Sequence, residues 1–336
     1  MKVLVVGTEW WGDWVTSTAD AFTRLDIETE VLHIEKHIDS LARKFFSYPK
    51  YREYVNNKNR QQLKNRVDSF NPQLILIFNQ DLLDKDTAAY IRSRQIKTFQ
   101  WLGDDPFHVD DIVHNLDLYD EISIWDPYFI SPLELIANKK VHYLPAAGDD
   151  HIYKPLPDIK KDIDISFVGS ALGPNKILRP QIMLNLFNEL GPAVDNLKIE
   201  IYGDNNWKNS GDPRLAKCFK GRTADTAETN LINNRSHIVL NLHHPQNVEA
   251  TNLRTFEVAL SGSFQLANAK SEITNLYGEL ITTFNDIKGL ADGIQNYLNN
   301  PKATEENINK VRDITLQNHT YVKRAETILD IIKTAL

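Results

Sequence analysis

Residues 2–7 read KVLVVG, and residues 163–169 read IDISFVG. Both runs are short, mainly apolar and end in glycine. A run of this kind is typical of a buried parallel strand that leads into a ligand-binding loop. We therefore predict that each run opens an α/β domain of its own.

Strand-like and helix-like segments alternate after both runs. The further strands are expected at residues 28–33, 73–78, 97–101, 121–125 and 141–144, and at 198–202, 237–242, 263–266 and 279–283. This alternation predicts doubly wound parallel sheets. Right-handed crossovers then place the loops that follow the strands at one edge of each sheet, where ligands bind.

The chain has 336 residues, which suits two domains of roughly 150 residues each. The segment 145–162 contains three prolines and is predicted to be the interdomain linker. We expect one Rossmann-like domain over residues 1–150 and a second over 151–318, with a cleft between them. A C-terminal helix over residues 319–336 is expected to pack back on the N-terminal domain.

The composition is that of an ordinary soluble protein, with 42% apolar and 25% charged residues. The apolar run at residues 3–6 is too short for a membrane span and lacks the features of a signal peptide. The single cysteine, Cys218, cannot form an internal disulfide and agrees with a reducing compartment. We therefore expect a cytoplasmic protein.

The formal net charge is −7, which argues against nucleic-acid binding. Positive charge is nevertheless concentrated at Lys36–Arg66, where nine Lys or Arg residues stand against Asp39 and Glu53. One interpretation is a pair of helices with a solvated basic face. The other is a contact surface for an anionic acceptor or for the inner face of a membrane, to which the protein would bind peripherally.

The segment Val248–Leu266 reads VEATNLRTFEVALSGSFQL, and its Glu249 and Glu257 bracket seven residues. If a helix begins near Asn252, its free N–H groups can hold a diphosphate, and Arg254 adds a forked positive donor. Glu257 lies about one turn further on, where it can accept the hydroxyls of a ribose. Glu249 would point from the preceding loop toward a sugar. The alternative is that both glutamates are surface charges.

This segment resembles the signature of the group-1, family-four-like GT-B glycosyltransferases: two glutamates in this spacing, a small-residue helix that ends in glycine, and an apolar strand. The chain is similar to the spore-maturation-type branch of that group at several stretches. They are residues 252–257, 164–170 with Arg179, 144–147 with 153–155, 219–221, 238–242 and 319–321. The resemblance covers most of residues 95–336 and is weak over 1–94. Glu249 is not a constant feature of that branch, and residues 169–173 lack its Gly-Gly pair.

The resemblance implies a GT-B fold, with two Rossmann-like parallel sheets facing across a cleft. The N-terminal domain would bind an acceptor and the C-terminal domain a nucleoside-diphosphate sugar, which is a co-substrate; no cofactor and no metal are implied. Transfer would retain the anomeric configuration, as in most enzymes that carry this signature, whereas a strong catalytic base at Asp104 would favour inversion. The implied donor-binding residues are Glu257 for the ribose, Arg254 with Asn252 and Leu253 for the diphosphate, Gly169, Ser170, Arg179 and Lys220 near the phosphates, and Tyr202 and Gly203 beside the base. His243 follows a predicted strand, and we expect it to line the same cleft.

Asp104 and Asp105 follow the predicted strand at 97–101, at the edge where cleft residues belong. Either carboxylate could orient or deprotonate an acceptor hydroxyl, and Glu249 could also act in catalysis. The alternatives are that Asp104 and Asp105 cap the next helix or form a paired-Asp metal site.

The loop after the first strand carries Trp10, Trp11 and Asp13, followed by Trp14. Such a loop suggests stacking on an acceptor, although some of its tryptophans could instead pack in the core. The predicted function is glycosyl transfer to an unidentified acceptor. The alternatives are a GT-B-fold nucleotide-sugar epimerase and a catalytically silent nucleotide-sugar-binding protein.

Overall fold

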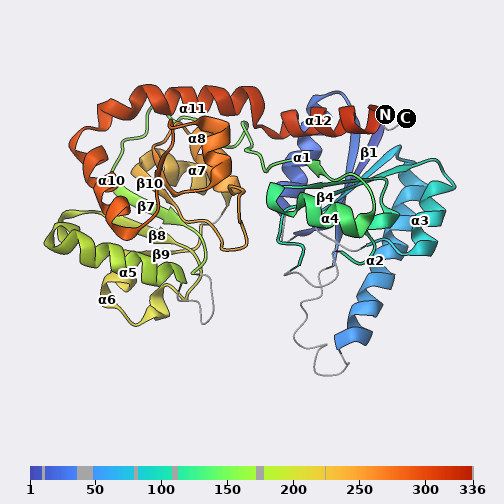
Figure 1. Cartoon of the computed structure of the whole chain (residues 1–336), viewed down its shortest axis with the longest axis horizontal. Helices are drawn as coiled ribbons and strands as arrows, with labels where there is room; N and C mark the ends of the chain where they lie inside the picture. The colour runs from blue at the N-terminus through green and yellow to red at the C-terminus, as the bar shows by residue number, and fades with distance from the viewer. Residues whose placement is uncertain are drawn as a thin grey trace. The chain divides into compact units, whose positions relative to one another are not determined.

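The structure is a computed structural model that describes residues 1–9, 12–35, 48–78, 82–107, 113–171, 178–223 and 225–334. The chain divides into two compact units. The N-terminal unit comprises Met1–Pro145 with Tyr321–Leu336, and the C-terminal unit comprises Ala146–Thr320. Each unit is an α/β domain built on a parallel sheet (Figure 1).

The sheet of the N-terminal unit has the strand order β2-β1-β3-β4-β5-β6. Its strands are β1 (Lys2–Thr8), β2 (Glu28–Ile34), β3 (Leu74–Phe78), β4 (Lys97–Leu102), β5 (Glu121–Ile124) and β6 (His142–Tyr143). Its helices are α1 (Gly12–Arg24), α2 (Tyr48–Phe70), α3 (Lys85–Arg92), α4 (Ile130–Ala137) and α12 (Tyr321–Thr334), with the 3-10 turns η3 (Leu116–Leu118) and η4 (Pro127–Phe129). Neighbouring strands are parallel throughout.

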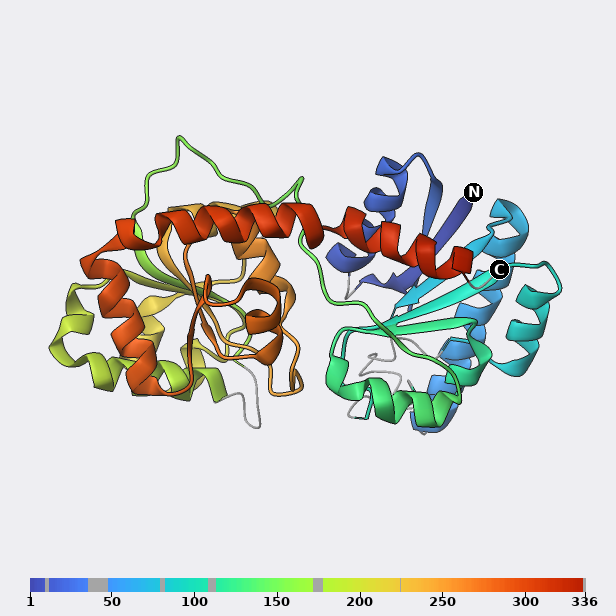
Figure 2. The same cartoon turned by 45° about the horizontal axis from the view of Figure 1, so that its top comes forward.

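Helices cover both faces of this sheet. The side chains of β1 are therefore buried on both sides, and apolar and polar residues do not alternate along the strand. Leu4 and Val6 of β1 join a core cluster with residues of α2, α3 and α4. Successive side chains of a strand point to opposite faces, so Val3 and Val5, which are also fully buried, face the other way. The helices α1 and α12 pack against each other (Figure 2), and Arg324 of α12 donates from Nε to the carbonyl of Pro145.

The sheet of the C-terminal unit has the strand order β12-β11-β10-β7-β8-β9. Its strands are β7 (Ile163–Val168), β8 (Ile199–Tyr202), β9 (Phe219–Gly221), β10 (Ser236–Asn241), β11 (Gln265–Asn268) and β12 (Thr282–Phe284). Its helices are α5 (Leu178–Leu190), α6 (Pro213–Cys218), α7 (Thr226–Arg235), α8 (Leu253–Leu260), α9 (Ser271–Tyr277), α10 (Ile287–Asn299) and α11 (Glu305–Asn318), with the 3-10 turns η6 (Gly191–Asn196), η7 (Lys208–Ser210) and η8 (Pro301–Thr304).

The two faces of this second sheet carry different side chains. Ile165 and Phe167 of β7 pack in a core cluster with α5, α6 and α10. Ser166 points to the opposite face, where Ser236 of β10 donates to its hydroxyl at 2.7 Å. The helices α7 and α8 contact each other and β10, so they cover this second face.

The segment expected as a linker is packed on α7. Asn230 makes two hydrogen bonds to the backbone of Lys154. Its Oδ1 accepts from the Lys154 N–H at 3.3 Å, and its Nδ2 donates to the Lys154 carbonyl at 3.1 Å. Asn234 accepts from the N–H of Leu156 at 2.7 Å. These side chains satisfy the backbone of an irregular segment that has no ladder partners of its own.

The two parallel sheets confirm the predicted pair of Rossmann-like folds. The hydrophobic pattern did not predict β9, because a three-residue strand is too short to show a period, although the family resemblance includes residues 219–221. No helix in the described part of the chain has the length and apolar character that a bilayer span requires.

Candidate functional site

The C-terminal sheet has a topological switch point between β7 and β10. The chain passes from β7 to β8 and β9 on one side, and β10, β11 and β12 lie on the other. Because the loops after β7 and β10 lead in opposite directions, open sheets of this kind bind ligands at this point. Gly169 and Ser170 follow β7, and His243 follows β10, so the structure places three predicted donor residues here.

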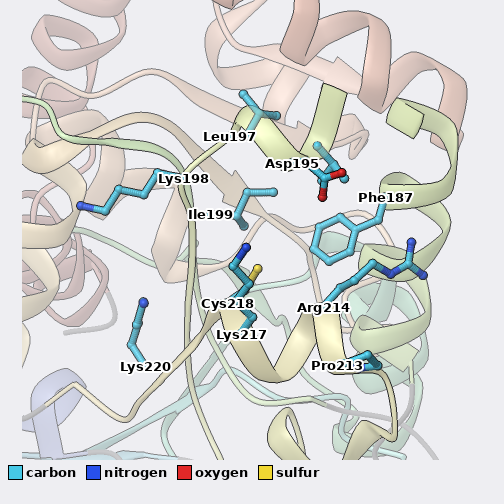
Figure 3. A pocket seen from close by; sticks show the side chains of 11 residues that line it. Phe187, Asp195, Leu197, Lys198, Ile199, Pro213, Arg214, Lys217, Cys218 and Lys220 are labelled. Atoms are coloured by element: carbon cyan, nitrogen blue, oxygen red, sulfur yellow. The ribbon is translucent and has the colours of Figure 1, made fainter. Parts of the chain in front are cut away.

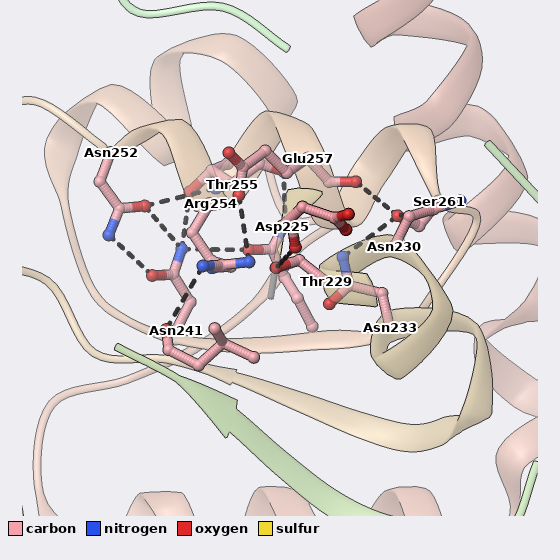
Figure 4. Close-up of polar contacts among 12 residues, drawn as sticks. Asp225, Thr229, Asn230, Asn233, Asn241, Asn252, Arg254, Thr255, Glu257 and Ser261 are labelled. Carbon is pink, nitrogen blue, oxygen red and sulfur yellow. Dashed lines mark hydrogen bonds and ion pairs between the residues drawn. The ribbon is translucent and has the colours of Figure 1, made fainter. Parts of the chain in front are cut away.

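The N-terminus of α8 lies at the same place. Asn252 is its N-cap and accepts from the N–H of Thr255 at 3.3 Å, while its amide pairs with that of Asn241 at the end of β10 (Figure 4). The N–H groups of Leu253 and Arg254 are in the first turn and have no acceptor within the helix. They can therefore serve an anionic ligand.

Arg254 and Glu257 form an ion pair one turn apart on α8. Arg254 Nη1 lies 3.1 Å from Glu257 Oε2, and Arg254 Nη2 lies 3.4 Å from the carbonyl of Val168 at the end of β7. Both side chains are less than a fifth exposed. The pair holds the Arg254 guanidinium between α8 and β7, where its Nη1 is buried and makes no well-directed hydrogen bond.

Arg179, on α5, is buried behind Arg254. It donates from Nη1 to the carbonyl of Ser170 at 3.0 Å and from Nη2 to the carbonyl of Leu242. Burial, together with the charge of Arg254, lowers the pKa of Arg179 to about 10, so it remains cationic at neutral pH. No described carboxylate forms an ion pair with it. Arg179 therefore ties the loops after β7 and β10 together and adds positive charge to the site.

Gly169 and Gly203 allow the loops after β7 and β8 to approach each other closely. A Cβ on Gly203 would lie 2.2 Å from the carbonyl oxygen of Gly169, and one on Gly169 would lie 2.9 Å from the ring of Phe167. Trp207 Nε1 donates to the Gly169 carbonyl at 2.9 Å, and the Gly169 N–H donates to Tyr202 at 2.8 Å. The backbone groups of Gly169 thus bind protein; the exposed Ser170 beside it is the residue open to a ligand.

His243 belongs to a directed chain of hydrogen bonds. Asn268 Oδ1 accepts from both the backbone N–H and Nδ1 of His243, at 2.7 and 2.9 Å, so Nδ1 carries the proton. Nε2 then accepts from Thr251 Oγ1 at 2.8 Å, and Thr251 Oγ1 accepts from Thr255 Oγ1. Asn241 Nδ2 donates to Thr255 Oγ1 at 2.9 Å and completes the chain.

The burial of His243 fixes its charge. Burial is the main reason that its pKa falls to about 4, with Lys270 and Arg179 acting in the same direction against the hydrogen bond that Nδ1 donates to Asn268. The ring is therefore neutral at pH 7. It connects β11 to the first turn of α8 as a positioning group within the site.

Glu249 is half-buried in the loop between β10 and α8. Its carbonyl accepts from the N–H of Glu272 at 3.2 Å, which anchors this loop at the start of α9. The structure thus brings Glu249 into the loop that carries His243.

Tyr202 is hydrogen-bonded within β8, and Lys220 lies on the edge strand of the sheet. The hydroxyl of Tyr202 donates to Glu200 at 2.6 Å, and burial together with that carboxylate raises the pKa of Tyr202. Lys220 is exposed on the edge strand β9 and lines a separate pocket with residues 187–218. Neither side chain is brought to the first turn of α8.

In the N-terminal unit, Asp104 and Asp105 follow β4 as predicted, and both are half-buried. Asp105 Oδ1 accepts from the N–H of Phe107 at 2.9 Å, so Asp105 stabilises a turn. A Cβ on Gly103 would lie 2.8 Å from Trp14 and 3.0 Å from Trp125, which explains the glycine before the two carboxylates.

Trp14, in the same tryptophan-rich stretch, is 1% exposed and packs in the core. Its ring contacts those of Phe78, Trp101 and Trp125 at centroid distances of 4.5, 5.2 and 4.4 Å. Asp13, in contrast, is exposed in the first turn of α1. Trp10 and Trp11 lie outside the described residues, so their predicted contact with an acceptor stays a prediction.

Much of the described basic segment is paired with carboxylates. On α2, Lys58 pairs with Glu35, Arg60 Nε lies 3.3 Å from Asp84, and Arg66 Nη1 lies 2.6 Å from Glu30. Residues 36–47 are outside the described part. The described ion pairs fit a solvated helix face.

Some site residues could not be found from the sequence. Asn241, Thr251 and Asn268 are polar residues at strand ends or in loops, and their partners are distant in sequence. The only signal was their position, since Asn241 lies near the end of the predicted strand 237–242 and Asn268 lies two residues after the predicted strand 263–266. No group of three or more His, Cys, Asp or Glu side chains arranged to hold a metal ion occurs among the described residues.

Comparison with known proteins finds one matching family model and many solved structures that share the fold. Residues 179–330 match the model of a family described as glycosyl transferase-like. The matched region begins at Arg179 and includes all of α8. No curated protein sequence matches the chain.

Solved structures share the whole fold at low sequence identity. Sucrose-phosphate synthase from Thermosynechococcus elongatus is 10% identical with a TM-score of 0.70, over 99% of this chain and 98% of that one. Anabaena HepE in complex with UDP-glucose is 15% identical with a TM-score of 0.63, over 99% and 100%. The UDP-GlcNAc 2-epimerase of Neisseria meningitidis bound to UDP-GlcNAc is 11% identical with a TM-score of 0.60, over 99% and 100%. These likenesses confirm the GT-B fold class.

Proposed function

We propose that this protein is a glycosyltransferase of the spore-maturation-type branch, which moves a sugar from a nucleoside-diphosphate sugar to an acceptor. The observation that carries the proposal is the pair of guanidinium groups, Arg179 and Arg254, beside the first turn of α8. Two guanidinium cations, together with first-turn N–H groups that have no acceptor within the helix, can bind a diphosphate at the switch point of the sheet. The match to a glycosyl transferase-like family over the same residues supports this assignment.

In the proposed donor complex, Arg254 and the N–H groups of Leu253 and Arg254 hold the diphosphate. They also stabilise the negative charge that develops on it as the glycosidic bond breaks. Glu257, oriented by Arg254 at 3.1 Å, accepts the ribose hydroxyls. Because fixed protein cations supply this charge stabilisation, we propose that transfer proceeds without a metal ion.

The nucleotide is proposed to be UDP. HepE in complex with UDP-glucose and the epimerase bound to UDP-GlcNAc share the fold of this chain, and their likeness motivates the choice of base. Transfer is proposed to retain the anomeric configuration.

The acceptor is proposed to bind at the N-terminal unit. Asp104, which follows β4 at the carboxyl edge of that sheet, would orient the acceptor hydroxyl. Asp105 supports the same turn through Phe107.

The test begins with a thermal-shift screen against UDP, GDP, dTDP and their sugars, because a ligand that binds the folded state raises its apparent stability. Release of the nucleoside diphosphate is then measured with a panel of saccharide, lipid-linked and small-molecule acceptors, with and without EDTA. We expect UDP and UDP-sugars to stabilise the protein, and EDTA to leave release unchanged. NMR of the product determines the anomer.

Two other outcomes separate the rival functions. A new nucleotide sugar formed from the donor alone would identify an epimerase. This rival is included because the Neisseria meningitidis epimerase shares the fold of this chain. Donor binding without release in the presence of any acceptor of the panel would identify a silent binding protein.

A further inference from the structure

A pocket of about 370 Å³ opens beside β9, the edge strand of the C-terminal sheet. Its floor is apolar and includes Phe187 of α5, Ile199 at the start of β8 and Leu197, which follows η6 (Figure 3). All of its lining residues lie between residues 187 and 220, so none comes from α8. Its volume falls in the range of small-molecule sites, which is roughly 300–1,000 Å³.

Two of the cations at this pocket are already neutralised. Lys198 Nζ lies 2.6 Å from Asp162 and 3.5 Å from Glu200. Arg214 holds Asp212 with two nitrogens, at 3.0 and 3.2 Å. These side chains frame the pocket and leave little charge for a ligand.

Lys217 and Lys220 differ from them. Both are exposed, and neither forms an ion pair with a described residue. The acidic residue of the lining, Asp195, lies near Leu197, whereas Lys217 and Lys220 lie beyond Ile199 (Figure 3). The pocket therefore has an apolar floor with unneutralised positive charge at one end.

The positive charge at this end of the pocket is opposite in sign to the net charge of the chain. The chain carries a formal net charge of −7, so its overall field disfavours the approach of anions. A cationic end next to apolar side chains therefore favours a ligand that has both an anionic group and an apolar body. An anionic head would meet the lysines, and an apolar body would cover Val194 and Leu197, which keep exposed apolar surface next to the buried Phe187 and Ile199.

We propose that this pocket is a second ligand site, separate from the donor site, for a small amphipathic anion with a flat apolar body and one carboxylate, sulfonate or phosphate group. The body lies on Val194 and Leu197, over the buried Phe187 and Ile199, and the anionic group lies between Lys217 and Lys220. The proposal does not depend on the glycosyltransferase function.

Cys218 makes the site directly measurable. It lines the pocket, it is half-buried, and it is the single cysteine of the sequence. Burial raises the pKa of its thiol against the opposing effect of Lys217 and Lys220, so alkylation is slow enough to follow. Its rate of modification therefore reports on the occupancy of this pocket.

The probe is 8-anilino-1-naphthalenesulfonate, and its matched control is N-phenyl-1-naphthylamine, which has the same rings without the sulfonate. The rate of Cys218 alkylation by N-ethylmaleimide is measured with each compound. We expect the sulfonate to slow alkylation in a saturable way, and the neutral compound to require a concentration about tenfold higher, the factor that corresponds to one lost charge-assisted contact.

The variants Lys217→Gln and Lys220→Gln should each weaken protection by the sulfonate, whereas Lys302→Gln, an exposed lysine of the same unit, should not. Each variant is compared with and without the probe, so a change in the intrinsic reactivity of Cys218 cancels. Absence of saturable protection, or equal protection in the Lys217 and Lys220 variants, would overturn the proposal. Protection by UDP would also overturn it, because Lys220 would then belong to the donor site.

Discussion

Asn241 and Asn252 bond each other through both ends of their side-chain amides. Asn252 Nδ2 donates to Asn241 Oδ1 at 2.9 Å, and Asn241 Nδ2 donates to Asn252 Oδ1 at 3.0 Å. One residue ends β10 and the other caps α8. The pair therefore fixes where α8 begins relative to the sheet, and hence where its first-turn N–H groups point.

Replacing Asn241 with leucine should destabilise the protein by about 1–3 kcal/mol, because Asn252 and Thr255 lose a buried partner. Donor affinity should fall as well, since the first turn of α8 loses its anchor. Urea unfolding and calorimetry with UDP measure the two effects. Asn296→Leu, on the exposed side of α10, is the control and should change neither.

Arg179→Lys and Arg254→Lys should differ in their effects. Arg179 is buried and bridges two carbonyls, so the lysine should cost about 1–3 kcal/mol of stability. Arg254 is less constrained, so its replacement should leave stability nearly unchanged but weaken UDP binding about tenfold by removing the forked donor. Urea midpoints and calorimetric affinities separate the two roles; equal losses of stability would contradict this division.

Glu257→Ala should distinguish a ribose contact from a group that only orients Arg254. If Glu257 binds the ribose, affinity for UDP should fall at least about tenfold while affinity for inorganic pyrophosphate changes little. If it acts only through Arg254, both affinities should fall together. Calorimetry with the two ligands gives the answer, and Glu306→Ala, an exposed residue of α11, serves as the control.

His243 should make stability dependent on pH. Its folded pKa of about 4 lies below its unfolded value of 6.5, so the unfolded state binds the extra proton first as the pH falls. Stability contributed by the neutral ring is complete above pH 6.5 and should decline by roughly 3 kcal/mol down to pH 4.

The His243→Gln variant should show a shallower decline across that window in urea unfolding at fixed pH values. His237→Gln, a half-exposed histidine of β10, should keep the steep decline. A His243→Gln profile parallel to that of the unaltered protein would show that another group carries the pH dependence.

Asp104→Asn should lower turnover without changing UDP affinity, if Asp104 orients the acceptor hydroxyl. Asp105→Asn should have little effect, because an asparagine oxygen can accept from the Phe107 N–H as the carboxylate does at 2.9 Å. Steady-state release of nucleoside diphosphate compares the two variants. Turnover of Asp104→Asn equal to that of the unaltered protein would make Asp104 a structural residue.

Local patterns in the sequence were sufficient for the fold class and for one half of the candidate site. Apolar runs predict the strands because burial on both faces of a parallel sheet demands them. The segment from Asn252 to Glu257 predicts its own geometry, since residues three apart on a helix face the same way. The 3.1 Å pair of Arg254 and Glu257 follows from that spacing.

The tertiary structure decided which distant residues join that segment. Strand order places Arg179 beside Arg254 and links His243 to Asn268, whereas it leaves Lys220 on the edge strand and Tyr202 bonded to Glu200. Helical and strand periods specify which face a residue occupies, but not which element lies opposite it. That depends on the order of the strands and the path of the loops, which arise from the packing of the whole domain.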